Sequence, residues 1–173
     1  MDGRRTHRGF TLIELATVMT VIAVMAVAVA GPTLSFVGTQ RSRLAASRLA
    51  NDLTYAQRRA INTGLRTWVV FDIPGNSYSL FIENLYQRGK ANRIAARHPL
   101  TGTTAPIAFG MGDYAGVSLL SVSFDGGAEL EFDSLGRPRN SDSSELAANG
   151  QITLTNGVTV TVTRVSGLVE QAG

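Results

Sequence analysis

The pattern of apolar and polar positions changes in character along this 173-residue chain. Residues 10–30 are apolar almost without interruption, and Glu14 is the charge within them. At about 1.5 Å per residue, a helix of this length spans the hydrocarbon core of a bilayer. The first pattern therefore predicts a membrane anchor, and we expect the anchoring helix to cover residues 10–31.

A second pattern begins after Pro32, where small and apolar residues recur at spacings of four and three. This spacing predicts an amphipathic helix over residues 32–63, with one face packed on a sheet and Gly64 as its C-terminal stop. Gly31 and Pro32 should interrupt or kink the helix, because proline lacks a backbone donor. The predicted buried face consists of Ser42, Ala46, Leu49, Leu53, Ala56 and Ala60, and the polar positions include Arg41, Arg43, Arg48, Arg58 and Arg59. We interpret these arginines as solvated positions beside the apolar stripe, in preference to a track for DNA.

From Arg66 onward the period of the pattern is two, which is typical of strands. Turn signals at residues 73–76 (IPGN), 125–127 (DGG) and 156–157 (NG) separate the strand-like runs. The last of these favours a type I′ turn. The expected hairpins join residues 67–72 with 77–83, 117–124 with 128–133, and 151–155 with 158–165.

Residues 86–116 lack clear periodicity and are rich in arginine, glycine and threonine. One short strand is expected around residues 107–109, and the rest is predicted to be a loop. Long loops in compact domains often carry partner contacts, so this segment is a candidate for them.

Glu14 is unusual in its surroundings, because a carboxylate in an apolar membrane helix costs about 2.5–3.5 kcal/mol on insertion scales. Because Glu14 lies near one end of the segment, one interpretation gives it no special function: its side chain simply reaches the lipid head groups. A residue of this kind otherwise has a partner and a function.

The motif around Glu14 resembles a known processing signal. Residues 8–15, RGFTLIEL, resemble the type III signal of type IV pilins and type II secretion pseudopilins. The resemblance implies that a membrane peptidase cuts after Gly9 and methylates the new amine of Phe10. It also implies that Glu14 meets the terminal amine of a neighbouring subunit as helices pack into a filament, which gives the buried carboxylate its cation.

An ordinary secretory signal is the main rival for this segment. Such a signal has an apolar stretch of about 7–15 residues before a small-residue cleavage site. Residues 28–31, AVAG, offer a superficial site, but the apolar run is longer and the glycine–phenylalanine–glutamate arrangement precedes it. Arg4, Arg5 and Arg8 should hold the leader, residues 1–9, on the cytoplasmic side, so the remainder faces outward.

Composition limits what this remainder can be. About 140 residues beyond the anchor suit one modest globular domain, and the chain has no cysteine with which to form a disulfide. The formal charge of +3 comes largely from the leader, whose removal takes away three arginines and one aspartate and leaves 13 basic against 12 acidic side chains. The basic balance is therefore weak evidence for a nucleic-acid partner.

The order of one long helix followed by hairpins resembles the GspH/FimT group of minor pseudopilins and minor pilins. Residues 132–137, FDSLGR, resemble the turn between strands in that family. The resemblance implies an α+β lollipop fold with a β-sandwich head over residues 64–173, located in the periplasm and anchored in the bacterial inner membrane by a single pass. It also implies a minor pseudopilin that assembles, in a type II secretion system, with other pseudopilins, the prepilin peptidase and the inner-membrane assembly platform. A minor pilin of a type IV pilus is the first alternative.

DNA uptake is a second alternative, from a different class of function. Some FimT-like pilins bind DNA through a glycine-arginine-any-arginine motif near the C-terminus, and residues 136–139, GRPR, match its letters with Arg137 and Arg139. The match lies after the strand that contains Phe132. The segment after the last expected strand, residues 167–170, reads GLVE and lacks both cations. DNA binding by Arg137 and Arg139 is therefore disfavoured relative to turn formation.

The sequence does not favour an enzyme. His7 lies in the leader and His98 in the expected loop, so they make no catalytic pair, and His98 is interpreted as a surface residue. Glu129, Glu131 and Asp133 alternate along one strand as a solvated face would. We expect no catalytic residue, no metal and no cofactor.

Overall fold

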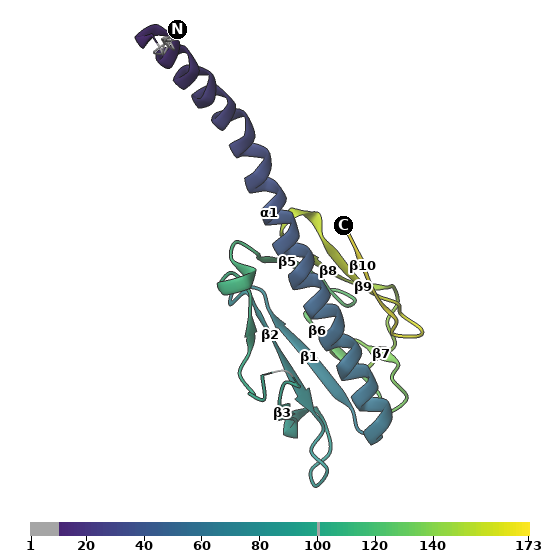
Figure 1. Ribbon diagram of the computed structural model, residues 1–173. Helices are drawn as coiled ribbons and strands as arrows, with labels where there is room; N and C mark the ends of the chain where they lie inside the picture. Colours follow the sequence, from purple (N-terminus) through teal and green to yellow (C-terminus); the bar gives the residue numbers. More distant parts are fainter. Residues whose placement is uncertain (1–10, 100) are drawn as a thin grey trace, which may run out of the picture. The chain divides into compact units, whose positions relative to one another are not determined.

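The computed structural model describes residues 11–99 and 101–173, apart from the side chains of residues 28–35. Helix α1 (Leu12–Thr63) is followed by strands that pair antiparallel (Figure 1). The chain divides into two compact units, Met1–Val37 and Gly38–Gly173, which we call the N-terminal unit and the head unit. The α+β class predicted from the pattern is confirmed, whereas the lollipop shape, the sandwich and the proposed domain boundaries stay predictions.

The head-unit part of α1 has the buried stripe that its spacing predicts. Ser42, Ala46, Leu49, Leu53, Ala56 and Ala60 are all at most 1% exposed. Helix α1 continues through Gly31 and Pro32, so the expected interruption there was wrong, whereas the kink stays a prediction. Gly64 has a φ of 67° and donates its N–H to the Ala60 carbonyl at 2.9 Å, which is the C-terminal stop expected of glycine.

One sheet has the strand order β3-β2-β1-β6-β7, with β4 also paired to β2. Its strands are β1 (Thr67–Asp72), β2 (Ser77–Ile82), β3 (Ile94–Ala95), β4 (Ile107–Ala108), β6 (Glu129–Phe132) and β7 (Pro138–Arg139). The hairpin of β1 and β2 is confirmed, and Asn76 in its turn has a φ of 48°. Trp68 and Val69 of β1 are fully buried because this strand lies in the middle of the sheet, with neighbours on both sides.

The other sheet has the order β10-β9-β8-β5. Its strands are β5 (Leu119–Ser123), β8 (Gly150–Leu154), β9 (Thr159–Val162) and β10 (Val169–Ala172). The hairpin of β8 and β9 is confirmed, and Asn156 and Gly157 both have positive φ. The loop has three residues, Thr155–Gly157, instead of the two of a simple type I′ turn. Strand β10 was missed in the sequence, where residues 167–170 were placed after the last strand.

The hairpin predicted across residues 125–127 was wrong as a strand pair. Phe124 and Gly127 exchange backbone hydrogen bonds at 2.9 and 3.1 Å, so the tight turn itself forms. Beyond it the strands separate, because β5 pairs with β8 in one sheet and β6 pairs with β1 and β7 in the other. The turn residues fix the chain reversal, whereas long-range pairing decides the ladder.

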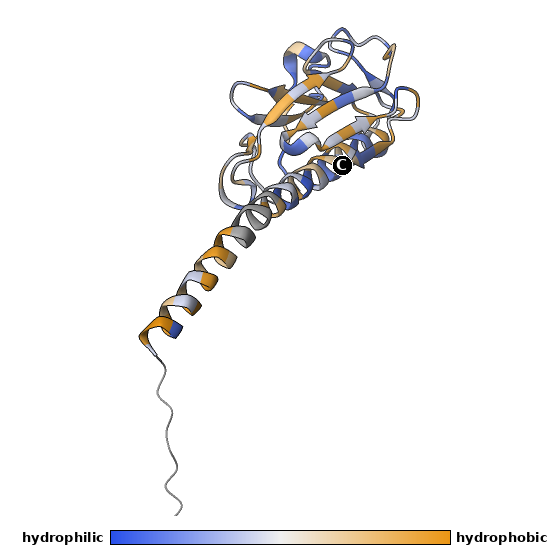
Figure 2. Cartoon of the chain, turned by 90° about the horizontal axis from the view of Figure 1, so that it is seen from above, coloured by the Kyte–Doolittle hydropathy of each residue, from blue (hydrophilic) through white to orange (hydrophobic). Residues whose placement is uncertain are grey.

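A single hydrophobic core joins α1 to both sheets. Leu49 and Leu53 of the helix belong to the same buried cluster as Phe71 of β1 and Val160 of β9. Figure 2 shows the mixed hydropathy of the head unit, which contrasts with the mostly apolar start of α1. The apolar side chains of this core are therefore buried within the head unit itself.

The segment 86–116 has more order than a simple loop. It contains short 3₁₀ turns at Lys90–Asn92 and Gly112–Tyr114, and strands β3 and β4 attach it to β2. The strand expected around residues 107–109 is present as Ile107–Ala108. Its role in partner contacts stays a prediction.

Candidate functional site

The N-terminal end of α1 is capped by Thr11. The Glu14 N–H donates to the Thr11 hydroxyl at 3.3 Å and to the Thr11 carbonyl at 3.1 Å, so Thr11 acts as the N-cap. Glu14 is then the third helical residue, where the positive end of the helix dipole favours a carboxylate. This stabilising contribution was not predicted from the sequence, although threonine three residues before glutamate is a known capping signal.

The apolar side chains that follow are open to solvent in the single chain. Exposed fractions range from 50% at Val18 and Val21 to 87% at Leu12, and residues 12–27 show no buried face. Thr17 and Thr20 donate their hydroxyls to the carbonyls of Ile13 and Ala16, so their polar atoms are satisfied within the helix. A helix that is hydrophobic all round is typical of one buried in protein or lipid.

A shallow groove of about 410 Å³ runs along this helix beside the carboxylate. Its lining consists of Glu14, Thr17, Val18, Val21 and Ile22. Such a surface is suited to an apolar helix that brings a cation to the level of Glu14, since a charge taken out of water needs a partner. Gly9 and Phe10, the expected cleavage and methylation sites, lie outside the described residues.

Arg137 and Arg139 converge on one carboxylate in the turn between β6 and β7. Their Nε atoms donate to Asp133 Oδ2 at 2.9 and 3.1 Å, while Asp133 Oδ1 accepts the N–H groups of Leu135 and Arg137, each at 2.9 Å. Burial alone would raise the pKa of Asp133, but these backbone N–H groups and the two guanidinium groups outweigh it and lower the pKa. The carboxylate therefore organises the turn as an anion.

These contacts bear on DNA binding without testing it. The Arg139 side chain is 18% exposed and also lies 3.7 Å from Glu145, whereas Arg137 is 49% exposed. Both arginines already have an anionic partner, which supports their role in the turn. Phosphate binding by Arg137 and Arg139 stays a prediction.

The interpretation of His98 as a surface residue was wrong. His98 is 2% exposed, and its Nε2 lies 2.8 Å from Asp52 Oδ1. Asp52 Oδ2 accepts hydrogen bonds from Tyr78 Oη at 2.6 Å and from Arg48 Nε at 3.1 Å. Arg48 is therefore an internal partner of Asp52 and not a solvated position. We call Arg48, Asp52, Tyr78 and His98 the Asp52 cluster.

The sequence contained one signal for this cluster. Asp52 follows Leu49 by three residues and precedes Ala56 by four, so it belongs to the buried stripe. An acid at such a position needs partners. The partner His98 is 46 residues away in the chain and could not be found from local spacing.

The solvated acidic face predicted on β6 was also wrong. Glu131 is 1% exposed, and its carboxylate accepts hydrogen bonds from Trp68 Nε1 at 2.8 Å and from Ser143 Oγ at 2.6 Å. Glu129 pairs with Lys90 at 2.8 Å and with Arg93 at 2.9 Å. The alternating acids face basic and polar partners from other segments, which the strand pattern alone did not indicate.

No group of three histidine, cysteine, aspartate or glutamate residues in the described part of the chain is arranged to hold a metal ion. Within those same residues, no helix is both long and apolar enough to cross a bilayer.

Comparison with known proteins gives one match. Residues 4–30 fit the family model described as the prokaryotic N-terminal methylation motif. No curated protein and no solved structure matches the chain. The match supports a type IV pilin-like protein, which is structural in kind, is processed by a prepilin peptidase and assembles with other pilins. The prepilin-type signal also suggests membrane anchoring through the N-terminal helix.

Proposed function

We propose that this chain is a minor pseudopilin of a type II secretion system, which packs by its N-terminal helix into the tip of a periplasmic pseudopilus that supports protein export. The observation that carries the proposal is the open apolar surface of residues 12–27, with Glu14 as the charge within it. A surface of this kind, within the segment that matches the methylation motif, supports burial against partner helices or in lipid.

The proposed assembly step follows from the charge. The peptidase cuts after Gly9 and methylates the Phe10 amine, and this amine of one subunit lies against Glu14 of the next. Before assembly, residues 10–31 anchor the chain in the bacterial inner membrane with a single pass, and the head is periplasmic. The inner-membrane assembly platform then transfers the subunit into the filament.

Two neighbouring functions share part of this evidence. A minor pilin of a type IV pilus would use the same helix and the same Glu14, so the geometry does not favour one over the other. A DNA receptor for natural transformation has weaker support, because Arg137 and Arg139 are already paired with Asp133. Deletion strains separate the three, since they would lose protein export, pili or DNA uptake respectively.

The sharpest test substitutes the residue at the cleavage site and the residue of the proposed charge pair. Gly9→Leu should give an uncleaved precursor, and Glu14→Val should be cleaved and methylated but enter filaments on the order of tenfold less or worse, because the pair is lost. Mass spectrometry of the N-terminus and immunoblots of sheared filaments measure both results. Glu170→Val, which removes an exposed carboxylate of the head, is the matched control. Normal assembly of the Glu14 variant would overturn the charge pairing.

A further inference from the structure

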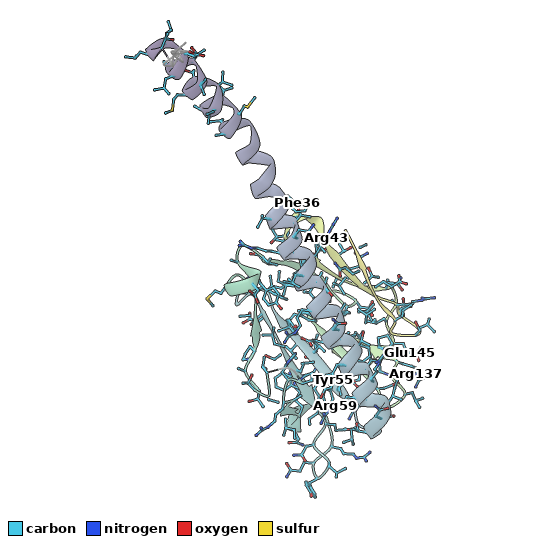
Figure 3. All side chains as sticks on the ribbon, viewed as in Figure 1. Phe36, Arg43, Tyr55, Arg59, Arg137 and Glu145 are labelled. Carbon is cyan, nitrogen blue, oxygen red and sulfur yellow. The ribbon has the colours of Figure 1, made fainter. Side chains whose placement is uncertain are left out.

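A second cleft lies in the head unit, where turns from the two sheets meet. It has a volume of about 330 Å³. Its walls come from the β6–β7 region, from the segment after β7 and from the β9–β10 turn. The lining residues are Arg137, Pro138, Glu145, Leu146, Arg164 and Val165. Arg137 and Glu145 lie close together in Figure 3.

The walls of this cleft are held in place by hydrogen bonds. Gln57 of α1 donates from its Nε2 to the Gly136 carbonyl at 2.9 Å and to the Ser166 carbonyl at 2.7 Å. One amide therefore ties together the two turns that carry Arg137 and Arg164. Gly167 has a φ of 68°, and a Cβ there would lie 2.5 Å from Gln57 Nε2, so this close approach requires glycine. The site is preformed, which lowers the cost of binding.

The charges along the cleft are only partly compensated. Arg164 donates from Nη1 to the Ala147 carbonyl at 2.9 Å, and no carboxylate of the described residues forms an ion pair with it. Arg137 shares Asp133 with Arg139, and half of its side chain is exposed. Glu145 is 75% exposed and 3.7 Å from Arg139, an open pair of little strength. Glu145 is therefore a weak counter-charge, and its partner Arg139 does not line the cleft.

The cleft also offers apolar contact. Val165 is 69% exposed at its rim, while Leu146 is 5% exposed and forms part of its floor with Pro138. A ligand that fits must combine a carboxylate with an aliphatic group a few ångströms away. These are the features of a short acidic peptide segment with aliphatic neighbours.

We propose that this cleft binds an acidic peptide segment of a partner protein, with a carboxylate held by Arg164 and Arg137 and an aliphatic side chain against Val165 and Leu146. The site would give the head a contact with another protein, separate from the packing of the N-terminal helix. It does not depend on the proposed secretion function. A nucleic acid fits less well, because its phosphates need several free cations in a row.

The experiment uses the full chain in detergent micelles and a fluorescent hexapeptide in which glutamates alternate with leucine and valine. Anisotropy titrations to about 1 mM protein cover the affinity range of single charged contacts. We expect saturable binding, and at least tenfold weaker binding of the peptide with glutamine in place of glutamate. Arg164→Gln should weaken binding about tenfold and Arg164→Lys less, whereas Glu145→Gln should strengthen it by removing a negative charge that repels the peptide carboxylate. Arg43→Gln, an exposed arginine on α1, is the matched control and should change nothing.

Several outcomes would overturn the proposal. The first is the absence of saturable binding, and the second is equal binding of the glutamate and glutamine peptides. The third is that the Arg164→Gln variant, the Arg164→Lys variant and the unchanged protein all bind the peptide with the same affinity. If a duplex oligonucleotide bound more tightly than the peptide, and this binding were lost in Arg164→Gln, the site would recognise nucleic acid and not an acidic peptide. Glu14→Val should bind the peptide normally, so a failure of helix assembly and a failure of this site are distinguishable.

Discussion

Glu14 and Asp52 lie on the same helix, but their surroundings are opposite. Glu14 is exposed, and its described contacts are those of a capped first turn. Asp52 is 3% exposed and has Arg48, Tyr78 and His98 as partners within the chain. The same contrast holds for the leucines around them, which are open near Glu14 and fully buried near Asp52. In one part of α1 the apolar and acidic side chains are therefore buried within the chain, whereas in the other part they are left exposed.

The largest effect should come from breaking the buried part. Asp52→Ala removes the shared acceptor of the Asp52 cluster and leaves Arg48 and Tyr78 without it, so we expect a loss of about 3–5 kcal/mol in the free energy of unfolding. Denaturant unfolding monitored by fluorescence of the buried Trp68 measures this loss. Asp142→Ala, an exposed aspartate, should cost less than about 0.5 kcal/mol. Equal stability of the two variants would mean that the cluster contributes nothing.

A matched pair of leucines sharpens the comparison further. Leu53 is fully buried and Leu15 is 56% exposed. Leu53→Ala should destabilise the head by about 2.5–5 kcal/mol because it leaves a cavity, whereas Leu15→Ala should leave unfolding within about 0.5 kcal/mol. Leu15→Ala should instead weaken filament entry, which the shearing assay detects. If Leu15→Ala lowered the stability of the head, the two parts of α1 would not be separable in this way.

The response to acid should be smaller and should come from the head. Burial opposes ionisation of Glu83, but hydrogen bonds from Arg66 and from the Gly89 N–H outweigh it and lower its pKa, as partners do at Asp133. Since folding lowers both pKa values, the stabilisation is complete above the ordinary values of 4.5 and 3.8 and is lost as pH falls through the lower folded values. Solvent screening of the half-exposed Arg137 limits the size of this stabilisation at Asp133.

Thermal unfolding between about pH 6 and pH 2 measures this response. Asp133→Asn should flatten the fall in the melting temperature on the acid side, and Asp142→Asn should not. A melting temperature that rises as pH falls through this window would contradict the assigned direction.

Local pattern predicted those elements whose contacts are local. The stripe from Ser42 to Ala60 follows from helical periodicity, and the β1–β2 and β8–β9 hairpins follow from turn residues that adopt positive φ. The separation of β5 from β6 could not be predicted, because the same turn serves either a ladder or two sheets. His98 and Glu131 were misjudged for a related reason, since their partners come from distant segments. Of the candidate site, Glu14 was identified from its motif, whereas the Arg164 cleft depends on two turns that only the fold brings together.

The double hydrogen bond of Gln57 has a consequence for how such a head can vary in length. Both acceptors, the carbonyls of Gly136 and Ser166, belong to tight turns, and each must stay within reach of the same side chain. Inserting or deleting a residue in either turn would move its carbonyl away from Gln57, so both turns should tolerate changes in length poorly. Loop grafting at this place in the head should therefore keep the length of both turns.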